Sequence, residues 1–530
     1  MVPPLVGGVG QTEAVTDPSP STSEIGFQSV SEARRLLQQG STTSVQLVET
    51  LLRRITEVDR EGPELRAVLA VCPDAIEAAR KLDAERRQGE VRGPLHGIAA
   101  LVKDNIDTAG SEGTTAGSLA LAMTRPVNDA FVVQRLRAAG VIVIAKSNLS
   151  EWANFRAKHS SSGWSAVGGQ CRNPHALDRS PGGSSSGSGA GVAAGLSPLA
   201  VGTETDGSIL CPAALNGVVG IKPTVGLTSR TGVVPISSSQ DTVGPIARNV
   251  LDAAALLGVL AGGAEGVDPL DAATTRRPRD LPVDYTEFCS RDGLSGARIG
   301  VPRRDYFGYS PKADALVEAA LRVARDAGAV IVDPADVATA EAIRKSDDET
   351  TVMLHEFKAG IETYLATRPP GNGQPRTVAE IVAFNEEHAA EELAFLGQEV
   401  LIAACEAGGL DSPAYLRARS RNWRRARRDG IDAALKNANA DVLAFPTTGP
   451  AWCIDHVNGD PHARAGYQAA AVAGYPAISL PVGKINGLPV GLCLVGPAWS
   501  EPVLIRIAFA LEQMLALDSH LQPQWRSRVE

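Results

Sequence analysis

A helical segment followed at once by a short apolar run is the pattern that most constrains how this chain can fold. It occurs three times, at residues 131–139 and 140–145, 315–327 and 330–332, and 431–440 and 442–446. Strands that alternate with helices pair into a sheet whose two faces the helices cover. We therefore expect an α/β fold, with one large domain built on a central mixed β-sheet that has helices on both faces.

The two ends of this domain are predicted from composition and periodicity. Residues 1–23 are rich in Pro, Ser, Thr and Gly, which is typical of a mobile tail. Residues 24–530 are expected to form the domain, and residues 24–90 its N-terminal helices. Apolar residues recur at helical spacing in residues 29–57, where Thr43 and Gln46 have the spacing of a capping box.

A second helical region interrupts the pattern of helices and strands. Between about residues 338 and 440 the composition becomes charged and helical, and the clearest helices are expected at 386–401 and 413–426. We interpret this region as a helical insertion that forms a rim over the site. The arginine-rich run 417–428 has two interpretations: a nucleic-acid patch, or a solvated helix face paired with nearby acids. The net charge of −9 favours the second.

Charge and composition also exclude several classes of partner. The acidic chain is a poor ligand for nucleic acid, and no apolar run of about 18 residues predicts a membrane span. The first ten residues lack the basic and apolar parts of a signal peptide. The seven cysteines are odd in number and contain no CxxC pair, as expected of reduced thiols. We expect a cytoplasmic protein that is a monomer or a homodimer.

The stretch 180–224 is the strongest candidate for chemistry. It contains two glycine-rich turns, each carrying serine, on either side of a segment of small residues. Glycine allows close approach of the backbone to a ligand, and clustered N–H groups can face a developing negative charge. The stretch therefore predicts a nucleophile and an oxyanion hole.

Competing motifs in the same stretch have little support. Residues 183–187 match the G-x-S-x-G of a nucleophile elbow, and residues 189–194 match a loose dinucleotide pattern, but neither follows a buried strand. None of the eight histidines has the spacing of a metal site. We expect no cofactor and no metal, and a base other than histidine.

Lys103 is the candidate base. It ends the apolar run within residues 94–104, where loss of water favours the neutral amine that can accept a proton. An ordinary lysine at a strand end is the alternative, and position alone favours that alternative.

Several blocks of the chain, taken together and in order, resemble the amidase signature family. They are GPLHGIAALVKDNID (93–107), GGSSSGSG from Gly182, GTETDGSI from Gly202, PAALNGVVGIKPT from Pro212, QDTVGPIARNV (240–250), FPTTGPAW (445–452) and AVAGYPAISLPVGKINGLPVGLCLVG (471–496). The resemblance implies a Ser–Ser–Lys triad in which Ser208 is the nucleophile, Ser184 the relay and Lys103 the base. It implies a cis peptide bond at the relay serine, and an oxyanion hole made by the N–H groups of Thr205, Asp206, Gly207 and Ser208.

The same resemblance suggests a substrate class. Members that act on small anionic amides or on glutamine often carry arginine at the position of Leu210, so a neutral or apolar acyl part is favoured here. Blocks such as 150–174 and 354–365 are similar to those of members that remove the C-terminal amide of peptides. The alternatives are a broader amidase on aryl, acyl or cyclic amides, and an ammonia-generating transamidosome subunit.

Candidate substrate contacts are Trp152, Ser185 and Leu210. Trp164 is a further aromatic candidate for a peptide cleft, although buried packing is an equal alternative for either tryptophan. Phe357 and Tyr364 lie on one face of a helix in the insertion and are expected in the core.

Overall fold

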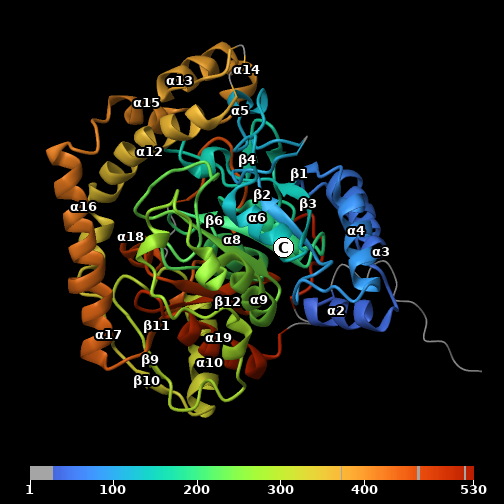
Figure 1. Cartoon of the computed structure of the whole chain (residues 1–530). Coiled ribbons are helices and arrows are strands. Elements are labelled where there is room, and N and C mark those ends of the chain that lie inside the picture. The colour runs from blue at the N-terminus through green and yellow to red at the C-terminus, as the bar shows by residue number, and fades with distance from the viewer. Residues whose placement is uncertain are drawn as a thin grey trace, which may run out of the picture.

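The centre of the protein is an eleven-stranded mixed sheet, in the order β1-β3-β2-β6-β8-β7-β12-β13-β11-β9-β10 (Figure 1). The structure is a computed structural model that describes residues 28–110, 112–369, 371, 373–461, 466–517 and 521–529. The strands of this sheet are β1 Val68–Val71, β2 Ala99–Lys103, β3 Ile142–Ser147, β6 Leu199–Glu204, β7 Val219–Lys222, β8 Thr242–Ala247, β9 Arg298–Gly300, β10 Val330–Val332, β11 Val442–Pro446, β12 Ala477–Ile485 and β13 Leu488–Val495. The expected mixed α/β sheet is confirmed.

Helices surround this sheet. Apart from those in the region after β10, the longer ones are α2 Val30–Gln39, α3 Ser44–Arg54, α4 Ala75–Arg87, α6 Phe131–Ala138, α7 Ser186–Ala193, α8 Leu210–Asn216, α9 Val250–Ala261, α10 Pro311–Asp326 and α19 Glu501–Leu515. Shorter pieces are α5 Leu119–Ala122 and α18 Gln468–Ala473, and the two-residue strands β4 Trp164–Ser165 and β5 Gly169–Gln170 pair apart from the main sheet. None of the helices in the described ranges is both long enough and apolar enough to cross a membrane.

The N-terminal helices form as their local sequence predicts. Gln46 N donates a 3.1 Å hydrogen bond to Thr43 Oγ1, and Thr43 N donates a 3.0 Å bond to Gln46 Oε1, so the capping box is closed at the start of α3. Val48 and Leu51 on the inner face of α3 are buried in the main core. The tail predicted at residues 1–23 lies outside the described residues.

The parallel pairing of β2 with its neighbours determines where Lys103 lies. β2 runs parallel to both β3 and β6, with Val102 opposite Val201 in β6. Carboxyl ends of parallel strands meet at the same edge of a sheet, where ligands usually bind. Lys103 at the end of β2 therefore lies beside Thr203 near the end of β6.

The helical region after β10 lies along one side and the top of the view in Figure 1. It comprises α11 Ala340–Arg344, α12 Asp348–Thr367, α13 Val378–Glu387, α14 Ala389–Glu392, α15 Glu399–Glu406, α16 Pro413–Ala426 and α17 Asp432–Ala438. Phe357 and Tyr364 of α12 are buried, as expected. The single helix expected at 386–401 is wrong, because the chain leaves the helical path between α14 and α15.

Tertiary contacts explain this break. Glu392 at the end of α14 accepts hydrogen bonds from Ser118 Oγ (3.1 Å) and Leu119 N (2.7 Å), and Arg156 Nη1 lies 3.2 Å from its other oxygen. Arg156 Nε also donates to Gly397 O at 3.1 Å. These contacts hold the segment between α14 and α15 against distant parts of the chain, and they override its helical propensity.

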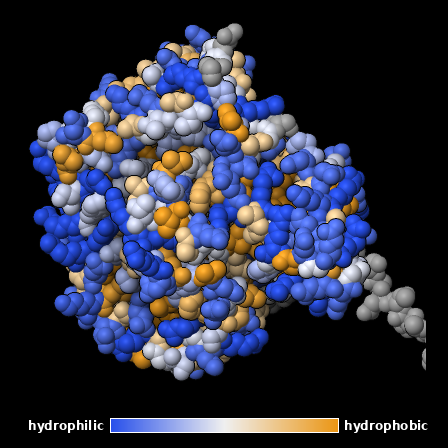
Figure 2. Space-filling model, viewed as in Figure 1, coloured by the Kyte–Doolittle hydropathy of each residue, from blue (hydrophilic) through white to orange (hydrophobic). Residues whose placement is uncertain are grey.

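The arginine-rich run lies mainly on α16 and pairs with acids. Arg421 Nε donates to Asp348 Oδ2 at 2.8 Å, and Arg425 Nη1 lies 2.9 Å from the same oxygen. Arg428 Nε donates to Asp429 at 2.7 Å. For these arginines the interpretation as an acid-paired helix face is confirmed. The face of the molecule shown in Figure 2 is mainly hydrophilic, with small and separate hydrophobic areas.

Candidate active site

Lys103 is completely buried at the end of β2, and its amine has a full set of partners. Nζ contacts Ser184 Oγ at 2.7 Å, Thr203 Oγ1 at 2.8 Å and Thr203 O at 3.2 Å. Burial lowers the pKa of Lys103 to about 7, against the opposing effects of Glu204 and Asp241. A neutral amine has two N–H groups and one lone pair, so Ser184 can donate its proton to that lone pair.

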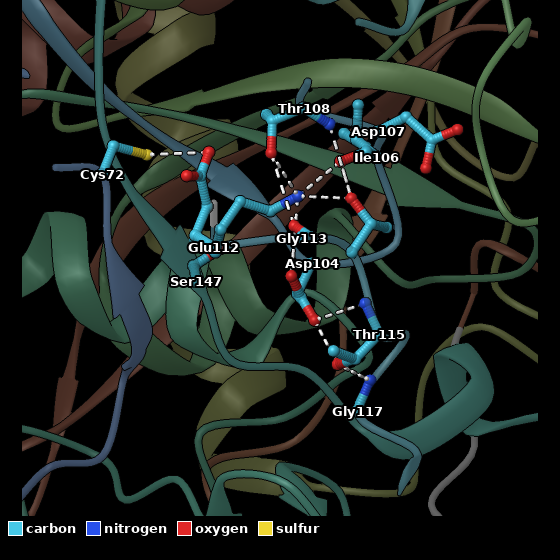
Figure 3. Close-up of polar contacts among 12 residues, drawn as sticks. Cys72, Asp104, Ile106, Asp107, Thr108, Glu112, Gly113, Thr115, Gly117 and Ser147 are labelled. Atoms are coloured by element: carbon cyan, nitrogen blue, oxygen red, sulfur yellow. Dashed lines mark hydrogen bonds and ion pairs between the residues drawn. The ribbon is translucent and has the colours of Figure 1, made fainter. Parts of the chain in front are cut away.

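The loop that follows β2 holds this strand end in place. Asp104 accepts hydrogen bonds from the backbone N–H of Thr115, at 2.9 Å, and from the Thr115 hydroxyl (Figure 3). Lys146 on β3 donates to Ile106 O at 2.6 Å and lies 3.5 Å from Asp104 Oδ1. The residue next to Lys103 is thus bound to the neighbouring strand and to its own loop.

Ser184 lies in the first glycine-rich turn, just before α7. The peptide bond between Gly183 and Ser184 is cis, as the resemblance implies. The turn is crowded, because a Cβ on Gly183 would lie 2.3 Å from Ser150 Oγ. Ser150 N also donates to Ser184 O at 3.1 Å. The side chain of Ser184 is therefore held against Lys103 with little freedom.

Ser208 lies in the second turn, between β6 and α8. Gly207 has φ +79°, and a Cβ there would lie 2.2 Å from the ring of Tyr467, so the turn requires glycine. Buried Glu204 accepts hydrogen bonds from Ile209 N (2.7 Å) and Leu210 N (2.9 Å), which hold the turn from behind.

The two turns are directly joined, since Ser185 N donates to Ser208 O at 3.1 Å. Within the described residues, the hydrogen bonds of the chain do not use the N–H groups of Thr205, Asp206 or Ser208 as donors. These N–H groups are therefore available for a ligand oxygen in front of Ser208.

A cavity of about 450 Å³ opens in front of these turns. Thr205, Asp206 and Ser208 line it together with Gly183, whereas Lys103 and Ser184 lie fully buried behind its wall. The structure thus brings together the three residues of the predicted triad and places the expected nucleophile next to open space.

The residues expected to contact substrate are not on the cavity wall. Trp152 is buried and packs edge-on against Phe357, with ring centroids 6.5 Å apart. Ser185 Oγ donates to Thr203 O at 3.1 Å, and Leu210 is buried in a core cluster with Phe445. These three side chains stabilise the turns and the insertion from behind. Trp164 is also buried, and its ring packs against that of Phe395.

Other cavity residues were not predicted individually as substrate contacts. Large side chains on the wall come from widely separated segments: Phe155, Ile236, Met353, Trp452 and Tyr467. The two serine turns and the block that contains Trp452 could be located from motifs, but how these segments meet to form one wall depends on distant loops.

The lysine and the aspartates that line the cavity are Lys158, Asp206 and Asp460. Burial raises the pKa of Asp460, although Ser162 N and Trp452 Nε1 both donate hydrogen bonds to it, at 3.0 and 2.7 Å. Among the described residues that line the cavity there is no arginine. The wall therefore has no guanidinium in the described ranges with which to hold a substrate carboxylate.

Comparisons with known proteins agree with this geometry. The family model described as Amidase matches residues 46–505. The crystal structure of native peptide amidase from Stenotrophomonas maltophilia is 49% identical, with a TM-score of 0.87 over 92% of this chain and 97% of that one. An amidase family protein from Bacillus anthracis is 32% identical, with a TM-score of 0.81 over 93% of this chain and 92% of that one.

A relative with a different assigned activity is also similar. It is one of the subunits of the glutamyl-tRNA(Gln) amidotransferase of Symbiobacterium thermophilum, and it is 37% identical over 92% of this chain and 96% of its own length. The relatives of this chain thus include proteins with different names. Similarity alone does not identify the substrate, which has to be argued from the cavity.

Proposed function

The chain belongs to the amidase family, and from that premise we propose that it hydrolyses the C-terminal amide of peptides, giving the free acid and ammonia. The observation that carries the chemistry is the 2.7 Å contact between Lys103 Nζ and Ser184 Oγ directly behind the turn of Ser208. The peptide preference is supported by the 49% identity to the Stenotrophomonas maltophilia peptide amidase.

In the proposed reaction, neutral Lys103 takes the proton of Ser184 while Ser184 takes the proton of Ser208. The Ser208 oxygen bonds to the carbonyl carbon, and the negative charge moves to the carbonyl oxygen. The N–H groups of Thr205, Asp206 and Ser208 face that oxyanion, where each preorganised donor is worth about 3–4 kcal/mol. The N–H of Gly207, expected in the same set, is bound by the Glu204 carboxyl group instead. The burial that lowers the pKa of Lys103 to about 7 leaves much of the amine neutral near that pH.

Collapse of the tetrahedral intermediate breaks the C–N bond. Ser184 returns a proton to the departing nitrogen, so that ammonia leaves and Ser208 carries the acyl group. Water then attacks the ester carbon, giving its proton to the same relay, and Ser208 leaves as the alcohol. Protons and charges balance over the two steps without histidine or metal.

One feature of the cavity favours a neutral acyl part over glutamine, because its described wall holds no arginine. Leu210, the position where arginine was considered, is buried behind the nucleophile turn and away from the cavity. A broader amidase on aryl, acyl or cyclic amides remains the first alternative, and a glutamine-handling subunit like that of Symbiobacterium thermophilum is the second.

A panel of substrates distinguishes these functions. We expect ammonia from N-acylated dipeptide amides, with kcat/KM well above that for free aliphatic amides and anilides, and no ammonia from glutamine. Preference for anilides would favour the broad amidase, and glutamine turnover would favour the glutamine-handling role.

Light scattering would check the predicted monomer or homodimer, and cell fractionation would check the predicted cytoplasmic location.

A further inference from the structure

Asp206 is a carboxyl group on the nucleophile turn that the proposed reaction does not use. Its side chain lines the cavity together with Ser208, two residues further along. Asp206 Oδ1 is buried, and no residue in the described ranges donates a hydrogen bond to it. A buried acceptor without a partner is costly, and its presence at a cavity points to a ligand that supplies the donor.

Two other carboxyl groups near the nucleophile turn, Asp241 and Asp460, have donors on both of their oxygens. Asp241 accepts bonds from Thr205 Oγ1 at 2.6 Å and from the N–H groups of Ile236 and Ser237 at 2.8 and 2.9 Å. Asp460 likewise has donors on both oxygens. Asp206 and Glu204 each have one buried oxygen that the described residues leave unsatisfied, and of these two residues only Asp206 lines the cavity.

The surroundings of Asp206 favour its neutral form. Burial and the nearby carboxyl groups of Glu349 and Glu204 raise its pKa well above the usual range, and Lys222 opposes them only weakly. Glu349 on α12 is itself held by Gln240 Nε2 at 2.9 Å and Gln468 Nε2 at 2.7 Å. A neutral carboxyl group still offers its carbonyl oxygen as an acceptor.

Chain geometry limits which substrate group Asp206 can meet. Two residues of chain span at most about 7 Å, and Asp206 and Ser208 line the same cavity, so a substrate bound at Ser208 is within reach of the Asp206 carboxyl group. The nitrogen bonded to that carbon carries two N–H donors in every primary amide. In an ester of the same acid, the corresponding oxygen carries no hydrogen.

We propose that the Asp206 carboxyl group accepts a hydrogen bond from the NH₂ group of the scissile amide and so makes the site select primary amides over esters. The inference rests on the proposed function. A site built around a substrate N–H rejects the analogue that lacks it, because a buried protein acceptor is then left unpaired. Asp206 transfers no proton in this role; it positions the leaving nitrogen.

The test compares the primary amide and the methyl ester of one N-acetylated dipeptide. Both substrates give the same acyl group on Ser208, so their deacylation steps are identical. We expect Asp206→Ala to lower kcat/KM for the amide about 10–100-fold and to change that for the ester less than about threefold. Asp206→Asn keeps an acceptor oxygen and should restore most of the amide activity.

Asp460→Asn is the matched control, since it alters a carboxyl group on the same wall whose oxygens already have donors. It should change the two substrates by the same factor. If Asp206→Ala fails to fold, Asp206→Val removes the acceptor, leaves a smaller gap than alanine does, and takes its place. An equal loss on amide and ester, or unchanged amide kinetics, would overturn the inference.

The proposed function fails in a different way. Wild-type turnover of both substrates by Ser208→Ala would reject Ser208 as the nucleophile, whatever the behaviour of Asp206. An unchanged ratio of amide to ester activity in the Asp206 variants, with Ser208→Ala inactive, would reject only the role of Asp206.

Discussion

Lys103 Nζ and Ser184 Oγ lie 2.7 Å apart although 81 positions separate them in the sequence, and both residues are fully buried. Parallel pairing of β2 with β6 places Lys103 at this position, and the crowded turn at Gly183 places Ser184 beside it. Because both groups are buried away from water, the protonation state of the pair depends on the protein groups that surround it.

The pH dependence of turnover should report Lys103. Its pKa is lowered to about 7, and only the neutral amine can accept the proton. We expect kcat/KM for a peptide amide to fall tenfold per pH unit well below pH 7 and to reach a plateau above about pH 8. Lys103→Ala should lose activity at every pH. A rate that keeps rising to pH 10 would contradict the lowered pKa.

Ser208→Ala should lower kcat/KM by a factor of at least about 10³, because the acyl-enzyme can no longer form. The variant should melt within a few degrees of the parent, since the Ser208 side chain lies on the cavity wall. Ammonia release and thermal unfolding check the two parts. Single changes of histidine to alanine should have far smaller effects. A histidine variant as inactive as Ser208→Ala would contradict the assignment of Lys103 as the base.

Thr203 is predicted to orient the base. Its hydroxyl oxygen lies 2.8 Å from Lys103 Nζ and 2.9 Å from Asn105 Nδ2. Thr203→Val removes that acceptor at constant volume, and we expect kcat to fall about tenfold or more with KM nearly unchanged, because a misplaced amine slows the proton transfer. Thr203→Ser keeps the hydroxyl and should retain most of the rate. A change in KM alone would argue for a role in substrate binding.

Arg156 should matter for stability far more than an exposed arginine does. It contacts both Glu151 and Glu392, and all three side chains are buried. Arg156→Ala leaves two carboxyl groups buried without a cation, and we expect a loss of about 3–5 kcal/mol in the free energy of unfolding, measured with urea. Arg80→Ala breaks an exposed pair with Glu77 and should cost about 0.5 kcal/mol or less. Similar losses for both would show that burial of the pair is unimportant.

Sequence alone predicted the elements with strong local signals. The capping box of Thr43 and Gln46, the helix that buries Phe357, and the apolar strand that ends at Lys103 all have their cause within a few neighbouring residues. The partnership of Lys103 with Ser184 has no such cause. It was predicted only because several blocks resembled one family, and the structure then supplied the geometry.

Features that depend on distant contacts were missed. Trp152 was expected to contact the substrate, but it is packed against Phe357 of the insertion. Phe155, three residues after Trp152, lies on the cavity wall instead. The helix expected at 386–401 ends early because Glu392 bonds to Ser118 and Leu119. No local pattern contains these contacts, since they form only when the sheet and the insertion meet.

The nucleophile turn has one further consequence, for synthesis of the protein. The ring that crowds Gly207 belongs to Tyr467, and Lys222 Nζ donates to Tyr475 O at 2.7 Å beside the pairing of β7 with β12. A nascent chain on the ribosome therefore carries Lys103, Ser184 and Ser208 long before it carries the residues that support the turn. The nucleophile turn therefore gains its contact with Tyr467 only when the C-terminal part of the chain has been synthesised.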